Sequence, residues 1–272
     1  MRIAIQGQAG SFHEQVARQW YGPQAECIPC TTFTEVFDTY EAGEADAIVT
    51  AVENTLYGSI NEVYQRIEEC SAPIIGEVKL SIDQMLITQP GVALMDITEV
   101  YSHPVALAQC REFLKTHLPN AEIIEFFDTA GAVEFIKAEG DVHMAAIAGE
   151  QAARLHSLPI LRRSIQDSGN NLTRFLVLEA TDTSPQANRA SLVITTTHKP
   201  GALVEVLQVF ADAGVNLVKL QSQPIIGSPW QYKFFIVVDC AGDTLYRLVE
   251  HIEKSDHEVT LLGEYVSAAD LR

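Results

Sequence analysis

Residues 165–178 read IQDSGNNLTRFLVL and change abruptly from a polar loop to an apolar run. We expect Thr173 and Arg174 to lie where a loop enters a buried strand, which is a common position for binding residues. Arginine offers a rigid fork of N–H donors that suits a carboxylate, and threonine offers a hydroxyl. The pair suits an oxygen-rich anionic ligand. From these residues alone, an ordinary strand start with a capping Thr173 and a solvated Arg174 is the simpler interpretation.

Composition places the chain among globular proteins of ordinary kind. It has 272 residues, of which 47% are hydrophobic and 20% are charged, so it is long enough for two domains. Its formal net charge is −18 at pH 7, which argues against nucleic acid or an anionic membrane as a partner. An anionic ligand would therefore need a local positive group, for which Arg174 is a candidate.

Neither a membrane anchor nor a metal site is predicted. No apolar run approaches the roughly 18 residues of a membrane span, and MRIAIQGQAG at the start lacks a signal peptide's apolar block. We therefore expect a cytoplasmic location. The five cysteines are odd in number and scattered, which favours reduced thiols. Cys27 and Cys30 form a single CxxC pair and the histidines form no HExxH motif, so no metal is expected.

The first 180 residues alternate strand-like and helix-like segments, which predicts an α/β fold. The predicted strands are 2–7, 25–30, 47–53, 99–103, 123–127, 145–149 and 175–179. Three helices are predicted to start with capping boxes, namely Ser11 with Glu14, Thr32 with Glu35, and Ser59 with Glu62. A further helix is expected to begin at Pro104. The mixed segment 74–88 is interpreted as a crossover between two lobes, with a return between Leu161 and Thr173 and a ligand cleft between the lobes.

Residues 181–189, TDTSPQANR, form a predicted linker, after which the pattern changes. The segments that follow are strand 191–197, helix 200–213, strand 215–225, strand 231–240, helix 243–254 and strand 258–266. This βαββαβ order is typical of a ferredoxin-like domain. The first of these helices presents an apolar face made of Leu203, Val206, Leu207 and Phe210.

Six motifs in order give the chain a family resemblance. They are GQAGSF at 7–12, VEN at 52–54 with GS at 58–59, SHP at 102–104 with AQC at 108–110, DTAGA at 128–132, AAIA at 145–148 and NNLTRF at 170–175. Taken together, they resemble prephenate dehydratase with a C-terminal ACT regulatory domain. The resemblance implies a two-lobed, periplasmic-binding-protein-like catalytic domain over 1–180, with lobes of about 1–78 plus 160–180 and 79–159. It implies a ferredoxin-like ACT domain over 190–272.

The same resemblance implies an activity and a set of site residues. Prephenate would lose its ring carboxylate as carbon dioxide and its hydroxyl as water to give phenylpyruvate, without a metal or organic cofactor. The implied catalytic residues are Thr173 and Arg174, and the implied substrate-binding residues are Ser11, Asn54, His103, Gln109 and Phe175. Phe175 is expected to be mostly core, and Glu53 stays outside the set because a buried carboxylate near an anion is unfavourable unless it is paired or protonated.

Chemistry assigns provisional roles to three of these residues. Hydroxide leaves poorly without a proton, so we expect Thr173 to hydrogen-bond the departing oxygen, with a relay through water or His103. Binding the departing carboxylate tightly would stabilise the ground state more than the transition state. We therefore expect Arg174 to bind the carboxylate of the retained pyruvyl side chain.

In the ACT domain, the resemblance implies an L-phenylalanine site at a subunit interface of a homodimer or homotetramer. Its residues would be Gly201, Ala202 and Leu203 of the PGAL turn, together with Gln221, Ser222, Gln223 and Pro224. The last four replace the family's usual ESRP, so two charges of the effector site are absent. Two alternative functions stay open: an arogenate dehydratase, and a non-catalytic sensor of amino acids or carboxylates.

Overall fold

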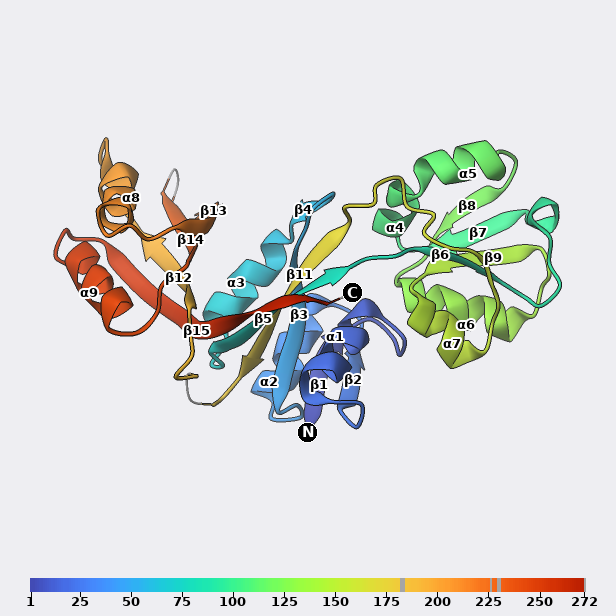
Figure 1. The fold of residues 1–272 in the computed structure, drawn as a ribbon, viewed down its shortest axis with the longest axis horizontal. Helices are drawn as coiled ribbons and strands as arrows, with labels where there is room; N and C mark the ends of the chain where they lie inside the picture. The colour runs from blue at the N-terminus through green and yellow to red at the C-terminus, as the bar shows by residue number, and fades with distance from the viewer. Residues whose placement is uncertain (182–183, 226, 229–230, 272) are drawn as a thin grey trace. The chain divides into compact units, whose positions relative to one another are not determined.

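The computed structural model describes residues 1–181, 184–225, 227–228 and 231–271 (Figure 1). Contacts divide the chain into two compact units. The first unit contains Met1–Val63 and Val78–Phe175, and the second contains Tyr64–Glu77 and Leu176–Ala269. This division differs from the predicted domain boundaries, which stay a prediction. None of the helices in the described residues is long and apolar enough to cross a membrane.

The first sheet of the first unit has the order β5-β11-β3-β1-β2, with β4 paired to β3. Its strands are β1 (Arg2–Gln6), β2 (Glu26–Cys30), β3 (Ala47–Asn54), β4 (Gly58–Ser59) and the parts of β5 (Ile74–Ser81) and β11 (Leu172–Glu179) that belong to the unit. The helices that follow these strands are α1 (Phe12–Tyr21), α2 (Phe33–Glu41) and α3 (Asn61–Glu69). β1 pairs in parallel with β2 and with β3, which confirms the predicted α/β class.

Two of the predicted helix caps form as expected. The Ser11 and Thr32 hydroxyls accept hydrogen bonds from the backbone N–H groups of Glu14 and Glu35, at 3.3 and 3.1 Å. The two glutamate carboxylates accept from the N–H one residue before each cap rather than from the cap itself. The cap hydroxyls therefore satisfy one free donor at each helix start, and the glutamates hold the incoming turns.

The third predicted cap is wrong. Ser59 lies in β4, where it pairs with Glu53, and α3 begins only at Asn61. A serine followed by a glutamate three residues later therefore does not by itself distinguish a helix start from a strand. The Pro104 prediction is confirmed, because Pro104 is the first residue of α4 and His103 caps that helix.

The second sheet of the first unit has the order β10-β6-β9-β7-β8. Its strands are β6 (Met85–Thr88), β7 (Glu99–Ser102), β8 (Glu122–Glu125), β9 (Met144–Ala148) and β10 (Ile160–Arg162). Its helical segments are η1 (Leu94–Asp96), α4 (Pro104–Gln109), α5 (Arg111–His117), α6 (Thr129–Glu139) and α7 (Glu150–His156). The chain enters through β5 and β6 and returns through β10 and β11, as the predicted crossover requires. The predicted strands omitted β5, β6 and β10.

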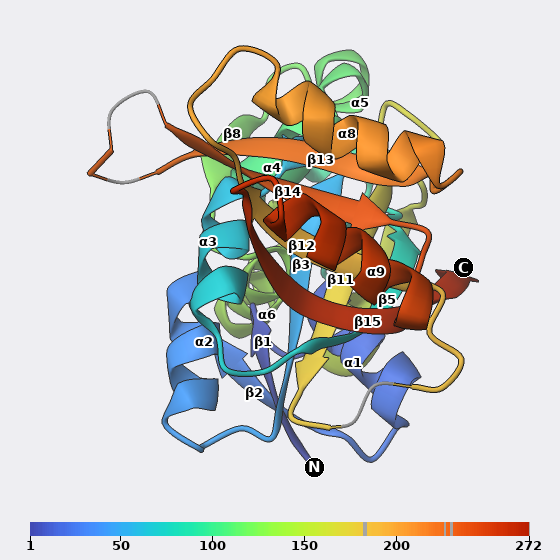
Figure 2. The same ribbon diagram turned by 90° about the vertical axis from the view of Figure 1, so that its left-hand side faces the viewer.

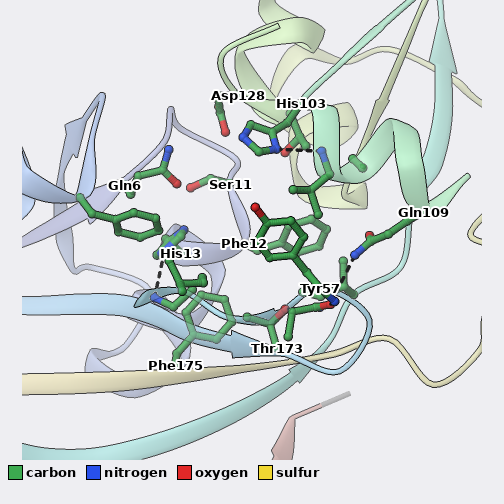
Figure 3. Close-up of a pocket in the computed structure, with 18 of the residues that line it drawn as sticks. Gln6, Ser11, Phe12, His13, Tyr57, His103, Gln109, Asp128, Thr173 and Phe175 are labelled. Atoms are coloured by element: carbon green, nitrogen blue, oxygen red, sulfur yellow. Dashed lines mark hydrogen bonds between the residues drawn. The ribbon is translucent and has the colours of Figure 1, made fainter. Parts of the chain in front are cut away.

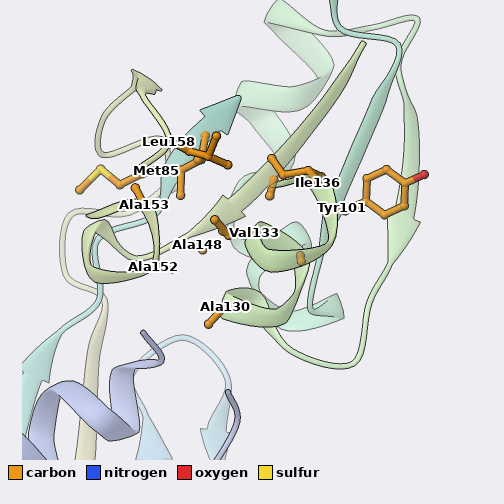
Figure 4. Packing of buried hydrophobic residues seen from close by; sticks show 12 residues of the cluster. Met85, Tyr101, Ala130, Val133, Ile136, Ala148, Ala152, Ala153 and Leu158 are labelled. Carbon is orange, nitrogen blue, oxygen red and sulfur yellow. The ribbon is translucent and has the colours of Figure 1, made fainter. Parts of the chain in front are cut away.

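Small residues let α6 and α7 pack closely on this second sheet. Ala130, Ala148 and Ala152 are fully buried in a cluster that also includes Val133 and Ile136 (Figure 4). Alanine side chains allow the helix backbones to approach the sheet, and the larger residues fill the remaining space. The N-terminal ends of α6 and α7 are thereby held in fixed positions.

The second unit contains the predicted βαββαβ domain. Its elements are β12 (Arg189–Thr195), α8 (Ala202–Asp212), β13 (Leu217–Pro224), β14 (Tyr232–Val238), α9 (Gly242–Glu253) and β15 (Glu258–Leu271). The antiparallel order is β13-β14-β12-β15, and both helices cover one face of the sheet (Figure 2). Val206 and Phe210 of the predicted apolar face are buried in its core. Of the predicted linker 181–189, residues 182 and 183 lie outside the described residues.

The turn between β1 and α1 connects the two sheets of the first unit. Gly7 and Gly10 have φ values of +94° and +89°. A Cβ atom at Gly7 would lie 2.9 Å from Asp128 Oδ1, and one at Gly10 would lie 2.8 Å from the Cα of Ala152. The Gln8 N–H also donates a hydrogen bond to Asp128 Oδ2 at 3.1 Å. Because glycine has no Cβ atom, Gly7 and Gly10 let the turn approach α6 and α7 this closely.

We expect Gly10→Ala to destabilise the protein more than Gly22→Ala. Gly22 has a similar φ of +92° and nothing within 4 Å of its Cβ position, so it is the matched control. The control loses about 1–3 kcal/mol because its backbone, with φ +92° and ψ 166°, is one that essentially only glycine adopts, and Gly10→Ala loses a further ~1–3 kcal/mol because its added Cβ clashes with backbone. Urea unfolding measures both changes. Equal losses would show that the close approach to Ala152 contributes nothing.

Candidate active site

A cavity of about 330 Å³ lies in the first unit and is lined by residues of the first sheet, of α1, α4 and α6, and of the segments that join these elements (Figure 3). Six of the seven residues predicted for catalysis and substrate binding line it, namely Ser11, Asn54, His103, Gln109, Thr173 and Phe175. They come from the β1–α1 turn, the end of β3, both ends of α4 and the start of β11. Arg174 is the predicted residue that does not line the cavity.

Thr173 receives a hydrogen bond whose direction is well defined. Asn54 Nδ2 donates to Thr173 Oγ1 at 2.9 Å, and both side chains are buried. The Asn54 Oδ1 atom accepts from the backbone N–H groups of Leu56 and Tyr57 at 2.9 and 3.0 Å, so the oxygen and nitrogen of the amide cannot be exchanged. Because Asn54 uses an acceptor position of the hydroxyl, the hydroxyl proton of Thr173 is available to a ligand.

A chain of amide side chains extends from Asn54. Its Nδ2 also donates to Asn171 Oδ1 at 2.7 Å, and Asn171 Nδ2 donates to Gln109 Oε1 at 2.9 Å. Gln84 Nε2 donates to the same oxygen at 3.3 Å. The network joins β3, α4, β11 and the residues just before β6 and β11, so the side chain of Thr173 is held by residues that are far apart in the sequence.

Arg174 occupies the other face of β11. Successive strand residues point to opposite faces, so Thr173 and Phe175 share the cavity side and Arg174 does not. The Arg174 guanidinium donates to Glu53 Oε2 at 2.7 Å, and only 9% of the residue is exposed. On β3, Glu53 and Asn54 are also successive residues, so their side chains point to opposite faces of the sheet. The structure therefore does not bring Arg174 into the cavity with the other predicted site residues, and the predicted contact of Arg174 with a substrate carboxylate stays a prediction.

His103 and Asp128 stand at the starts of α4 and α6 and line the same cavity. The His103 Nδ1 atom accepts a hydrogen bond from the Val105 N–H at 3.3 Å, so Nε2 carries the proton of the neutral ring. Burial lowers the pKa of His103, and the nearby Asp128 and Glu125 carboxylates oppose this effect. Asp128 accepts from the Gly131 N–H at 2.9 Å and caps α6. The ring is therefore neutral at pH 7 and can donate a hydrogen bond from Nε2.

Several cavity residues were missed by the sequence prediction. His13, Gln84 and Asp128 line the cavity, and Asn171 belongs to the network. Asp128 and Asn171 lie inside the DTAGA and NNLTRF motifs, so these motifs could have identified them as site residues. His13 and Gln84 carried none that distinguishes them from ordinary surface residues. Among the described residues, no lysine or arginine lines the cavity, and the carboxylates in its lining are those of Glu62 and Asp128.

The predicted effector residues are only partly brought together. In the second unit, Gly201, Ala202 and Leu203 line a cavity of about 390 Å³, together with His198 and Lys199. Gln221–Pro224 lie on β13, the edge strand of the sheet, and do not line this cavity. Within the described residues, no group of three or more His, Cys, Asp or Glu is placed to hold a metal ion.

Comparisons with known proteins agree with the predicted family. The family model described as prephenate dehydratase matches residues 3–183, and the ACT domain model matches residues 190–255. A bifunctional chorismate mutase/prephenate dehydratase of Aquifex aeolicus is 37% identical, over 98% of this chain and 74% of that protein.

Two solved structures are similar over the same extent. The prephenate dehydratase of Arthrobacter aurescens in complex with L-Phe has a TM-score of 0.88 and 30% identity, over 98% of this chain and 90% of the other. GqqA, described as a novel type of quorum quenching acylase, has a TM-score of 0.88 and 30% identity, over 98% of both chains. The ordered motifs, the α/β fold and these matches agree, and the chain belongs to the prephenate dehydratase family and carries a C-terminal ACT domain.

Proposed function

We propose that this chain is a carbon–oxygen lyase that converts prephenate to phenylpyruvate by decarboxylating dehydration. The observation that carries the proposal is the Thr173 hydroxyl, which accepts from Asn54 and keeps its proton available at the cavity. The cavity, of about 330 Å³, has the size of a small-molecule site. Its lining combines aromatic rings with neutral hydrogen-bond donors, which suits an unsaturated six-membered ring with oxygen substituents.

The reaction makes modest demands that these residues meet. Aromatisation supplies the driving force, so the protein must hold one pose, assist the departing hydroxide and limit access of water. The amide network fixes Thr173 through residues of β3, α4 and the segment before β11, which favours a defined orientation toward the leaving oxygen. His103 can donate from Nε2, and we assign Ser11 and Gln109 to substrate binding as cavity residues.

Arg174 and Glu53 are assigned to positioning. Arg174 pairs with Glu53 on the face of the sheet opposite Thr173, and the two residues neighbour Thr173 and Asn54 in sequence. A charge-assisted hydrogen bond between β11 and β3 fixes the two strands relative to each other. This supports the geometry of the Asn54–Thr173 hydrogen bond without contact to the substrate.

Regulation and assembly follow from the second unit. We propose that L-phenylalanine binds at the Gly201–Leu203 turn, where the first backbone N–H groups of α8 suit a carboxylate. The polar Gln221 and Gln223 at the position of charged residues in the family favour weak inhibition. A homodimer or homotetramer would use the β13 edge, which lies at the end of the sheet. The proposed domains are 1–180 and 190–272, and the proposed location is the cytoplasm.

A direct assay tests the activity. We expect the purified chain to form phenylpyruvate from prephenate, and Thr173→Val to lower kcat by at least about 100-fold because it removes the proton donor. Thr173→Ser keeps the hydroxyl and is expected to retain activity within about 10-fold of the parent. The same assay with and without L-phenylalanine measures inhibition.

Other outcomes of this assay would contradict the proposal in distinct ways. Faster turnover of arogenate than of prephenate would reassign the substrate and leave the role of Thr173 intact. Absence of turnover with either compound, together with tight binding of a carboxylate, would favour the sensor function. Unchanged activity of Thr173→Val would remove Thr173 from the mechanism.

His103 gives a prediction about pH. Because burial lowers the pKa of His103 below its ordinary value of 6.5, its imidazolium form exists only in more acidic solution. We therefore expect kcat to show no loss between pH 6.5 and pH 8.5 that depends on His103. His103→Gln keeps a donor near the Nε2 position and is expected to retain more activity than His103→Leu. A fall in kcat with an apparent pKa near 6.5 that His103→Gln abolishes would make the imidazolium the acid.

A further inference from the structure

A buried histidine in the cavity is not used by the mechanism described above. His13 lies in the first turn of α1, is 8% exposed and lines the cavity beside Phe175 (Figure 3). Its Nε2 atom accepts a hydrogen bond from the Ala51 N–H at 3.1 Å. An imidazole nitrogen that accepts cannot carry the proton, so the neutral ring is protonated at Nδ1.

The tautomer leaves His13 with one donor for a ligand. Among the described residues, Ala51 provides the only hydrogen bond to the ring. Burial lowers the pKa of His13 to about 3, so the ring is neutral at pH 7. His13 is therefore a neutral N–H donor in a cavity whose lining contains no lysine or arginine.

Packing fixes the direction of this donor. The His13 ring meets the Phe175 ring edge-on, with centroids 5.1 Å apart and an interplanar angle of 86°. The Phe33 ring lies 5.8 Å away at 58°. With Ala51 bound at one nitrogen and two aromatic rings beside it, the imidazole cannot rotate without losing these contacts. A donor held in this way loses little conformational freedom when a ligand binds.

Strand geometry separates His13 from the reacting hydroxyl. Thr173 and Phe175 lie two residues apart on the same face of β11, which corresponds to about 7 Å along the strand. The His13 ring contacts the Phe175 end of this pair. In a pose that lies along this direction, a six-membered ring whose hydroxyl meets Thr173 would bring its opposite carbon, which carries the carboxylate and the pyruvyl side chain, near His13.

We propose that His13 is a positioning residue that donates a neutral hydrogen bond from Nδ1 to an oxygen of the retained pyruvyl side chain. The inference rests on the proposed prephenate dehydratase activity. A donor aimed at the departing carboxylate would stabilise the substrate more than the transition state, whereas a donor aimed at the pyruvyl group stabilises both equally. His13 thus takes the binding role that the sequence assigned to Arg174, and it does so without a charge.

Two isosteric variants separate this role from a structural one. His13→Asn can place an amide N–H near the Nδ1 position but loses the acceptor for the Ala51 N–H. His13→Gln can accept from Ala51 with its Oε1 atom but has no atom at the Nδ1 position. The measurements are kcat and KM for prephenate, the dissociation constant of phenylpyruvate by calorimetry, and urea unfolding.

We expect His13→Gln to raise KM and the phenylpyruvate dissociation constant together by about 10- to 100-fold, with little change in kcat and in stability. His13→Asn is expected to keep both binding constants within about threefold while unfolding at lower urea, because the Ala51 N–H loses its partner. Phenylpyruvate retains only the pyruvyl carboxylate, so it isolates the group that His13 is proposed to bind.

Three results would overturn the inference. The first is unchanged phenylpyruvate binding by His13→Gln, and the second is a loss of binding in both variants that follows their stability. The third is a fall in kcat with unchanged phenylpyruvate binding, which would place His13 on the departing groups. Failure of the parent protein to turn over prephenate would reject the proposed function, while the phenylpyruvate calorimetry would still test His13 separately.

Discussion

The hydrogen bond from the Asn54 amide to the Thr173 hydroxyl is the constraint on which the active site depends. Its direction is fixed by the two backbone N–H groups from which Asn54 Oδ1 accepts, so Asn54 leaves the hydroxyl proton of Thr173 free for a ligand in the cavity. Asn171, which precedes β11, and Gln109, the last residue of α4, extend this bond into a network. A neutral alcohol is a weak acid, and a fixed orientation is the contribution that the fold can make to its function.

The proposed substrate site also relies on neutral hydrogen-bond donors. The chain carries a net charge of −18, and its cavity lining has no lysine or arginine to attract a dicarboxylate. Neutral donors such as the His13 and His103 imidazoles hold an anion less strongly than a guanidinium, but they leave the departing carboxylate less stabilised in the ground state. The Gly7 to Gly10 turn brings α1, which carries His13, against α6 and α7. The site thus depends on a close approach of backbones as well as on its side chains.

Ordered motifs predicted most of the residues that line the cavity, whereas features that depend on tertiary structure could not be read from the sequence. Thr173, Asn54, His103 and Gln109 were found because their motifs occur in a recognisable order, and the structure brings all four to one cavity. Arg174 belongs to the same NNLTRF motif as Thr173, but strand alternation places it on the opposite face of β11, where it pairs with Glu53. Ser59 and Glu62 match the pattern of a helix cap, but Ser59 lies in β4, where it pairs with Glu53 of β3. His13 could not be found from sequence, because its tautomer depends on Ala51, 38 residues away.

A double-mutant cycle on Asn54 and Thr173 tests the central claim most directly. If Asn54 acts by orienting the Thr173 hydroxyl, Asn54→Ala lowers kcat for prephenate at least about 30-fold in the parent, but less than about threefold when Thr173 is already valine. Any effect through the Leu56 and Tyr57 N–H groups is common to both backgrounds and cancels in the comparison. An equal loss in the two backgrounds would show that Asn54 acts independently of Thr173 and would contradict the account.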